Sequence, residues 1–473
     1  GPFSQGAFSQ TAPYPSMIVA MRVQILASFA TIALTLCGGC SGEAGSDSTG
    51  RPGPRPNVVV LLADTLRADV LSAYGAEDER APFLASLAQN GTVFGNTYST
   101  STWTAPSSAS MLTGVYPDRH GVTAGFLAQF RKAEDGVDEG ELEEMSLLSL
   151  ARDVPTLAER MGKLGYATYG LSSNVNIGSE LEFDRGFDRF WRSEGSVPAG
   201  GMSRKLREWE TEIKEGDRPY FLYMHFNDVH APYHVRKGYY NEGEGREKID
   251  EAFEVYKSEL GFLDFIIGNL YKKFGWDKNT LLVFVADHGE EFNDHGGVYH
   301  EFSVYNELSR VPFLIHAPDL GVKQGVVRQN TSLIDVTPTI LGLLGVTPEE
   351  ELDGSPLTSL CRSSEKAQAS DLVDALIERP LIVHRYEAGQ HLWSVIRERW
   401  KLIEAESGPM LFDLREDPGE TKNLAEEHEG LVSQLAGTLE THRSRGSSPD
   451  SEKKGVEIDP SLLRQLKSLG YVR

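Results

Sequence analysis

Three apolar runs in this chain each end in acidic or histidine residues, and they constrain the fold more than any other feature. They read NVVVLLAD from Asn57, FLYMHF at 221–226 and LLVFVA at 281–286. Short runs rich in valine and leucine are typical of strands buried on both faces of a parallel sheet. Ligands of such sheets bind beyond the carboxyl ends of the strands. The polar residues at these ends are Asp64, Asp228, His230, Asp287 and His288.

Helical patterns alternate with these runs. They lie at 81–89, 155–164, 203–214 and 249–274. This alternation predicts an α/β fold with a mainly parallel central sheet flanked by helices. From about residue 320 the pattern changes to one more apolar helix, several short antiparallel strands and a final capped helix. We therefore also expect a small C-terminal α+β subdomain.

Composition divides the chain into five parts. Residues 1–20, rich in Gly, Pro, Ser and Gln, are interpreted as an upstream extension. Residues 21–40 have one basic residue, an apolar run and small residues, which is typical of a secretory signal peptide. Residues 41–56 are interpreted as a flexible linker. The predicted α/β domain spans 57–346, and the C-terminal subdomain and tail span 347–473.

The end of the signal segment resembles a lipoprotein cleavage box. It reads CGGC and is followed by Ser41, so Cys40 would be the acylated residue, and plain cleavage is the alternative. A short hydrophobic anchor is a further alternative. The segment predicts export across the inner membrane, giving a periplasmic protein or an outer-membrane lipoprotein. Cys361 is then the one cysteine outside the signal segment, which excludes a disulfide framework and a Cys-rich zinc site.

The balance of charge limits the partners. The chain has 46 Lys and Arg against 69 Asp and Glu, a formal net charge of −23. Nucleic acid and anionic membrane surfaces require basic protein surface, so neither is expected as the main partner. An acidic enzyme with an anionic substrate needs local positive charge, most simply a bound cation. The acidic stretch at 134–144 is expected to be a solvated loop.

A group of oxygen and nitrogen donors is predicted at the strand ends. Asp64, Asp287 and His288 together suit a divalent cation, with Thr104 as a fourth ligand. The alternative for each residue taken alone is a helix N-cap, a position that aspartate favours.

Thr104 lies in the stretch STWTAPSSASMLTG at 101–114. Pro106 favours the first turn of a helix, so a helix is predicted to begin here. In one interpretation Thr104 is the N-cap. In the other, its hydroxyl lies at the positive end of the helix dipole, where an anion is stabilised. The stretch alone leaves both open.

Several histidines are candidates for proton transfer. His230, His295 and His300 can each donate a proton to a leaving group or bind an anion. A single histidine is more often structural, and His225 and His234 are expected to be structural or surface residues.

The order of these motifs resembles the sulfatase family of the alkaline-phosphatase superfamily, over about residues 56–430. The motifs are NVVVLLADTLRAD, the segment from APFLASLAQ to DRHGV, HFNDVHAPY, VADHGEEFNDHG and LFDLREDPGETKNL. The resemblance implies the fold described above, a metal-dependent ester hydrolase, and 57–346 as its catalytic domain.

Five positions depart from the family pattern. Sulfatases convert a Cys or Ser in the motif C/S-x-P-S/A-R to formylglycine. Here the window begins with Thr104 and ends with Ser108, so no formylglycine is expected. The paired family Asp-Asp is Asp64-Thr65. Ser173 and Asn174 stand where a Lys and a His bind sulfate in the family.

Other matches point towards phosphorus chemistry. Asp287-His288 in place of the family's Asp-Asn is similar to phosphonate monoesterases and phosphodiesterases of the superfamily. His230 matches a family histidine, and His300 aligns with a later active-site Lys. A threonine nucleophile is known in other branches of the superfamily.

The resemblance therefore implies a metal-dependent hydrolase of phosphate or phosphonate esters, with sulfate esters left open. Thr104 would be the nucleophile, and His230 or His300 would protonate the leaving oxygen. One divalent ion, Ca²⁺ or Mn²⁺ with Zn²⁺ as an alternative, would bind Asp64, Thr104, Asp287 and His288. A second metal on Asp228, His230, His295 and His300 is the less favoured arrangement.

Three other functions stay open. They are an arylsulfatase-type hydrolase of sulfuric esters, a transferase, and a catalytically weak lipoprotein that binds anionic glycans. The expected substrate is a small-molecule, glycan or lipid ester. Contact with a membrane is expected only through a lipid on Cys40.

Overall fold

The computed structural model describes residues 55–125, 149–243, 245–300, 303–362, 366–387 and 390–445. The chain divides into two units, Gly1–Gly53 and Pro54–Arg473, and the second contains every element described below. The predicted signal peptide with Cys40 and the acidic stretch at 134–144 lie outside the described residues. None of the helices in the described ranges combines the length and apolar character needed to cross a membrane.

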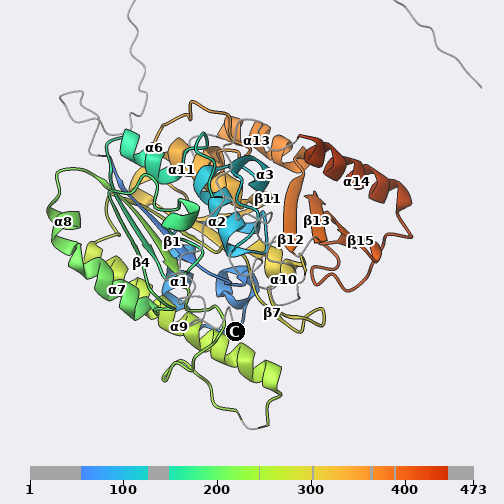
Figure 1. Cartoon of the computed structure of the whole chain (residues 1–473), viewed down its shortest axis with the longest axis horizontal. Coiled ribbons are helices and arrows are strands. Elements are labelled where there is room, and N and C mark those ends of the chain that lie inside the picture. The colour runs from blue at the N-terminus through green and yellow to red at the C-terminus, as the bar shows by residue number, and fades with distance from the viewer. Residues whose placement is uncertain are drawn as a thin grey trace, which may run out of the picture. The chain divides into compact units, whose positions relative to one another are not determined.

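A nine-stranded, mostly parallel sheet lies at the centre of the second unit, which confirms the predicted α/β class (Figure 1). Its strands follow the order β11-β2-β10-β6-β1-β5-β3-β4, with β9 paired to β2 beside that path. Within it, β9 and β10 run antiparallel to their neighbours. The strands are β1 Asn57–Ala63, β2 Thr92–Tyr98, β3 Ala167–Ser172, β4 Arg189–Arg192, β5 Tyr220–Phe226, β6 Thr280–Val285, β9 Arg310–Val311, β10 Phe313–His316 and β11 Gly325–Ser332.

Strand β1 lies inside this sheet because both of its faces are apolar. Every residue of the strand after Asn57 is buried. It pairs in parallel with β5, where Val58 is opposite Phe221, and with β6, where Val58 is opposite Leu281. Parallel pairing in this register brings the carboxyl ends of the three strands to one edge. The polar residues that follow them are therefore gathered there, as the sequence predicts.

Helices cover both faces of the sheet. In Figure 1, α7, α8 and α9 lie along one face together with α1, while α2, α6 and α11 lie on the other. The predicted helix at 203–214 is in fact two helices, because the chain leaves helical geometry at Trp209. The helices are α1 Pro82–Gln89, α2 Thr104–Thr113, α3 Pro117–His120, α6 Leu157–Lys163, α7 Ala199–Glu208, α8 Glu210–Glu215, α9 Lys248–Phe274, α10 Asn306–Ser309, α11 Val336–Leu343, α12 Thr358–Cys361 and α13 Lys366–Glu378.

A second, antiparallel sheet forms the C-terminal α+β part, as predicted. It has four strands in the order β12-β13-β14-β15, and α14 packs on one face. Its other face packs against Tyr98 and Val304 of the preceding part. The elements are β12 Leu381–Glu387, β13 Gln390–Arg397, β14 Trp400–Ala405, β15 Gly408–Asp413 and α14 Glu429–Ser444. The boundary at 346/347 stays a prediction.

Short elements complete the described chain. A two-stranded hairpin follows β6, and five 3-10 turns connect larger elements. They are β7 Glu291–Phe292, β8 Val298–Tyr299, η1 Ala68–Val70, η2 Ser72–Tyr74, η3 Ser179–Leu181, η4 Pro318–Leu320 and η5 Leu333–Asp335.

Candidate active site

Asp64 follows β1 directly and is completely buried. Its Oδ2 accepts a hydrogen bond from Asn174 Nδ2 at 2.5 Å and lies 3.0 Å from His225 Nε2. Its Oδ1 lies 3.4 Å from Thr104 Oγ1 and 3.7 Å from His288 Nε2. Residues that follow or belong to four different elements therefore meet at this one carboxylate.

Asp287 lies just beyond β6, and backbone donors hold its carboxylate. Its Oδ1 accepts hydrogen bonds from the N–H of Thr65 at 3.3 Å and the N–H of His288 at 2.9 Å. Its Oδ2 is buried and has no hydrogen-bond partner among the described residues. An unpaired, buried carboxylate oxygen is costly. A ligand at this atom would remove that cost.

Thr65, which donates its N–H to Asp287, has a strained backbone conformation. Its φ of 56° lies in the left-handed region, which is unfavourable for a β-branched residue. The Thr65 hydroxyl donates to Val229 O at 2.7 Å, and the Thr65 carbonyl accepts from Tyr256 Oη at 3.0 Å. These contacts hold the turn after β1 in place, and strain of this kind is concentrated at functional sites.

The imidazole of His288 is held in one orientation by the next residue. Its Nδ1 lies 2.9 Å from the carbonyl oxygen of Gly289, which can only accept, so Nδ1 carries the proton. Its Nε2 lone pair then faces Thr104 Oγ1, 3.3 Å away. Burial, reinforced by the charge of His300, lowers the pKa of His288 to about 3. The ring is therefore neutral near pH 7, the form that binds metals.

The pKa values of the two buried carboxylates are shifted in opposite directions. Burial acts to raise the pKa of Asp64, but the hydrogen bond and charge of His225 hold that pKa below its usual range. Burial and the nearby charge of Asp64 raise the pKa of Asp287 well above its usual range. A divalent cation would relieve this repulsion and allow both groups to ionise.

A cation is also favoured by the geometry of the donors. Asp64, His225 and Asp287 each offer a ligand atom, and the three atoms lie within 4.8 Å of one another. His225 is the candidate that the sequence analysis missed, because it lies inside β5 and not at its end. Its one signal is a histidine within a completely buried apolar strand. The unpaired Asp287 oxygen and this mixed carboxylate–imidazole set fit a divalent ion.

Thr104 is the first residue of α2 and does not cap it. Trp103 is the N-cap, and no side chain makes the capping hydrogen bond. The interpretation of Thr104 as an N-capping residue is therefore wrong. The Thr104 hydroxyl instead lies between Asp64 and His288, at the positive end of the helix dipole.

Two of the three histidines predicted for proton transfer, His300 and His230, lie on the side of His288. The ring centre of His300 is 4.6 Å from that of His288 and 5.0 Å from that of His230. The Nδ1 of His300 lies 2.9 Å from Glu290 Oε1, whereas the Nδ1 of His230 lies 2.5 Å from the carbonyl oxygen of Ala231. A carboxylate thus orients one of the two rings and a backbone carbonyl orients the other.

The residues considered for a second metal are not all brought together. His295 lies 2.7 Å from Glu307 Oε1 and stacks on Tyr305. Asp228 accepts the backbone N–H of Ala199 with both carboxylate oxygens. Among the described residues no second group of metal ligands forms.

Ser173 and Asn174 follow β3 directly and support the cluster. Besides its bond to Asp64, Asn174 Nδ2 donates to Asn227 Oδ1 at 3.0 Å. The Ser173 hydroxyl donates to the carbonyl of His225 at 3.2 Å. Both side chains therefore help to position Asp64 and His225. Ser108 is buried in α2.

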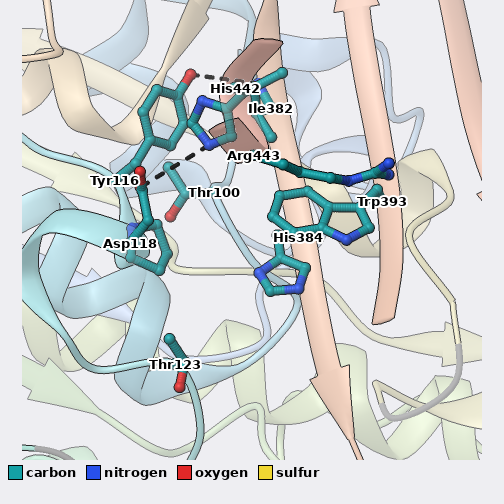
Figure 2. Close-up of a pocket in the computed structure, with 10 residues that line it drawn as sticks. Thr100, Tyr116, Asp118, Thr123, Ile382, His384, Trp393, His442 and Arg443 are labelled. Atoms are coloured by element: carbon teal, nitrogen blue, oxygen red, sulfur yellow. Dashed lines mark hydrogen bonds and ion pairs between the residues drawn. The ribbon is translucent and has the colours of Figure 1, made fainter. Parts of the chain in front are cut away.

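A cavity of about 220 Å³ lies where the main sheet's helices meet the C-terminal part (Figure 2). Figure 2 shows Tyr116 and Thr100 on one side of it and Trp393 with His384 on the other. The N–H of His384 donates to the carbonyl of Thr100 at 2.9 Å, so β12 is tied to the segment that leads into α2. The Asp and His cluster is not part of this cavity's lining.

Comparison with known protein families gives two matches. The family described as Sulfatase matches residues 56–346, more than half of the chain. The family described as N-sulphoglucosamine sulphohydrolase, C-terminal, matches residues 294–445.

Individual proteins are similar at low identity. The choline-sulfatase of Rhizobium meliloti is 24% identical over 87% of this chain and 90% of that protein. The N-acetylgalactosamine-6-O-sulfatase of Bacteroides thetaiotaomicron is 24% identical over 87% of this chain and 98% of that protein. The solved phosphonate monoester hydrolase of Agrobacterium radiobacter is 18% identical, with a TM-score of 0.65, over 83% of this chain and 96% of that chain.

The first family match includes β1, β5, β6 and α2, the elements that carry the cluster around Asp64. Members of this family are metal-dependent, which agrees with the donor set described above. The chain therefore belongs to the sulfatase family, in the alkaline-phosphatase superfamily, and is an ester hydrolase.

Proposed function

We propose that this enzyme hydrolyses phosphate and phosphonate esters with Thr104 as its nucleophile. The observation that carries the proposal is the position of Thr104 Oγ1, 3.4 Å from Asp64 Oδ1 and 3.3 Å from His288 Nε2. A threonine has one hydroxyl, so its ester cannot be released by elimination from a second hydroxyl, as in a hydrated formylglycine. Water must attack the central atom instead, a route that suits phosphorus.

The metal would bind Asp64, Asp287, His288 and the Thr104 hydroxyl, with His225 as a further ligand. Carboxylate oxygens favour Ca²⁺ or Mn²⁺, and the imidazoles also admit Zn²⁺. Bound there, a divalent ion supplies the positive charge that lowers the pKa of a hydroxyl and stabilises a phosphoryl oxyanion.

The residues of the chain then account for two steps. In the first, Thr104 Oγ, its proton released to solvent, bonds to phosphorus, the bond from phosphorus to the leaving oxygen breaks, and that oxygen takes a proton from His300. Glu290 orients His300 for this transfer, and His230 neutralises charge beside it. In the second step water attacks phosphorus and returns a proton to His300, the bond from Thr104 Oγ to phosphorus breaks, and Thr104 leaves as the alkoxide that began the cycle.

A second candidate is hydrolysis of sulfate esters. It is favoured by the similarity of this chain to a choline-sulfatase and an N-acetylgalactosamine-6-O-sulfatase. The same residues would act on sulfur in place of phosphorus. The signal segment at 21–40 supports a location outside the inner membrane for either activity.

A panel of four substrates tests the proposal. Metal-loaded protein is assayed on a phosphodiester, a phosphonate ester, a phosphate monoester and an aryl sulfate, beside Thr104→Ala and Thr104→Ser. The expected result is faster turnover of a phosphorus ester than of the aryl sulfate. Thr104→Ala should lose this turnover, and Thr104→Ser should retain part of it. Preference for the aryl sulfate would favour the second candidate. No turnover of any ester with metal bound would favour a protein that only binds anionic glycans.

A further inference from the structure

A large cavity lies along β11, which is one edge strand of the main sheet; β4 is the other edge strand. Its volume is about 910 Å³, and it separates β2 and β11 from the turns of the C-terminal sheet. We call it the arginine groove. Its charged and amide lining residues are Asn96, Asn306, Arg310, Arg328, Gln329, Asn330, Glu398, Arg399 and Arg415.

The arginine groove is positively charged although the chain carries a formal net charge of −23. Four arginines line it, against Glu398 as the one acidic lining residue. Among the described residues, Arg399 forms an ion pair, with Asp413. The Nε and Nη2 of Arg310 donate to the carbonyl of Gly95 at 3.2 and 2.7 Å, and no carboxylate of the described ranges pairs with this guanidinium.

The exposed cations are Arg328 and Arg415, which lie on β11 and just after β15. Neither has an ion pair with a described carboxylate. One guanidinium group can donate two parallel hydrogen bonds to two oxygens of a sulfate or phosphate group. Arginine is therefore the preferred cation for such ligands. The groove is therefore suited to a ligand with several tetrahedral anionic groups.

Amide and apolar side chains in the groove indicate a sugar backbone for that ligand. The Nδ2 atoms of Asn96 and Asn330 donate to backbone carbonyls at 2.8 and 2.6 Å, so their Oδ1 atoms can accept hydrogen bonds from hydroxyls. Val326 and Ile377 are 53% and 40% exposed in the same groove and offer apolar surface to the C–H faces of sugar rings. Acceptors and apolar surface suit a glycan better than an acidic peptide.

We propose that the arginine groove binds an anionic oligosaccharide through its sulfate or phosphate groups, apart from the ester that is cleaved. In the sheet, β11 is four strands from β1, roughly 19 Å at the ~4.8 Å spacing of strands. The groove shares no lining residue with the cluster around Asp64. The inference rests on the proposed function only in that one polymer would supply both the bound anions and the cleavable ester.

The test compares two double variants of equal charge change. Arg328→Gln with Arg415→Gln removes the two exposed groove cations. Arg204→Gln with Arg207→Gln removes two exposed arginines of α7, which packs on β3 towards the other edge of the sheet. Affinity for dextran sulfate and for phosphorylated dextran is measured by isothermal titration calorimetry, with uncharged dextran and polyglutamate as comparisons. Turnover of a small ester is measured alongside.

The groove variant is expected to bind the anionic dextran about tenfold more weakly, with turnover of the small ester unchanged. The α7 variant should bind like the parent enzyme. The preferred polymer shows whether sulfate or phosphate is the favoured group. Equal weakening in both variants, or unchanged binding in the groove variant, would overturn the proposal. So would polyglutamate binding as tightly as dextran sulfate. If no ester is turned over but groove-dependent binding persists, the proposed function fails and the glycan site stands.

Discussion

Trp103, and not Thr104, occupies the N-cap position of helix α2. The Thr104 hydroxyl is therefore not used for capping and faces Asp64 and His288. Thr104 is almost completely buried, 2% exposed, and its hydroxyl lies among groups that a cation would bind. In the proposed mechanism His300 is the proton donor, and Glu290 holds its Nδ1.

Replacing His300 by Asn should therefore slow the hydrolysis of alkyl esters by about 10²-fold or more. A nitrophenyl ester should lose much less, because its leaving oxygen needs no proton. Steady-state kcat/KM for the two esters is the measurement, with His230→Asn as the matched variant. Equal losses on both esters in His300→Asn, or a dependence on the leaving group in His230→Asn alone, would show that His300 is not the acid.

Asp287→Asn should change stability in opposite directions without and with metal. Burial and the charge of Asp64 disfavour ionised Asp287, so the variant should be the more stable one in metal-free buffer. A cation at one hundred times its Kd stabilises the parent enzyme by about 2.7 kcal/mol, and the variant should gain much less. Denaturant unfolding with and without the cation measures both effects. An equal gain in the variant would remove Asp287 from the metal site.

Residues at strand ends could be predicted from the sequence, and residues inside strands could not. Asp64, Asp287 and His288 follow apolar runs, so parallel pairing alone brings them together. His225 sits within β5, where a buried histidine is usually structural, and its contact with Asp64 depends on side-chain packing. The sequence alone also left open whether Thr104 is the N-cap or faces the site, because the answer depends on the residue at which the helix begins.

At the level of elements, the sequence predicts the strands that are apolar on both faces and misses the others. Strands β1, β5 and β6 are continuous apolar runs. Strand β2 contains Gly95, and strand β11 contains the polar sequence RQNTS. Neither strand is therefore a continuous run of apolar residues. The antiparallel β10 has four residues, too few for any periodicity.

Hydrogen bonds around a buried ion pair of the C-terminal part join this part to α10, which follows the hairpin β7–β8. Lys401 on β14 lies 2.8 Å from Glu420 Oε1, and both side chains are completely buried. The Lys401 Nζ also donates to Asn306 Oδ1 and Ser309 Oγ, each at 3.2 Å. The carbonyl of Glu420 faces His295 Nε2 at 3.3 Å. This network therefore holds His295 and α10, which lie on either side of His300 in the sequence.

Lys401→Met should destabilise the enzyme by about 3–5 kcal/mol, because Glu420 is left as an unpaired buried charge. Adding Glu420→Gln to the same variant should restore most of this loss. Denaturant unfolding of both single variants and the double variant forms the cycle. Simple addition of the two single losses would mean that the pair is not coupled.

The pair of His295 with Glu307 should make stability depend on pH. Burial acts to lower the pKa of His295, but the hydrogen bond and charge of Glu307 raise it to about 9. The unfolded value is about 6.5, so this contribution is complete below about pH 6.5 and is lost as the pH rises through 9. The free energy of unfolding should fall over that window in the parent enzyme and fall less in His295→Gln. The same slope in both proteins would contradict this assignment.

At the level of the whole described unit, two sheets have different tasks. The parallel sheet brings the donors around Asp64 to one edge, and the antiparallel sheet packs on the segments that lead into α2 and α10. The predicted α/β class and the C-terminal α+β part could be read from the order of patterns. Their contacts could not, since they depend on residues such as His384 and Lys401 that meet partners distant in the sequence.

The central claim is that Thr104 forms a covalent ester during turnover. Metal-loaded enzyme is mixed with a phosphonate or phosphate ester and quenched in acid, and its peptides are analysed by mass spectrometry. The account predicts a phosphoryl or phosphonyl group on Thr104 in the parent enzyme and none in Thr104→Ala, which should still bind the metal. Turnover without any adduct on Thr104, or undiminished turnover in Thr104→Ala, would contradict it.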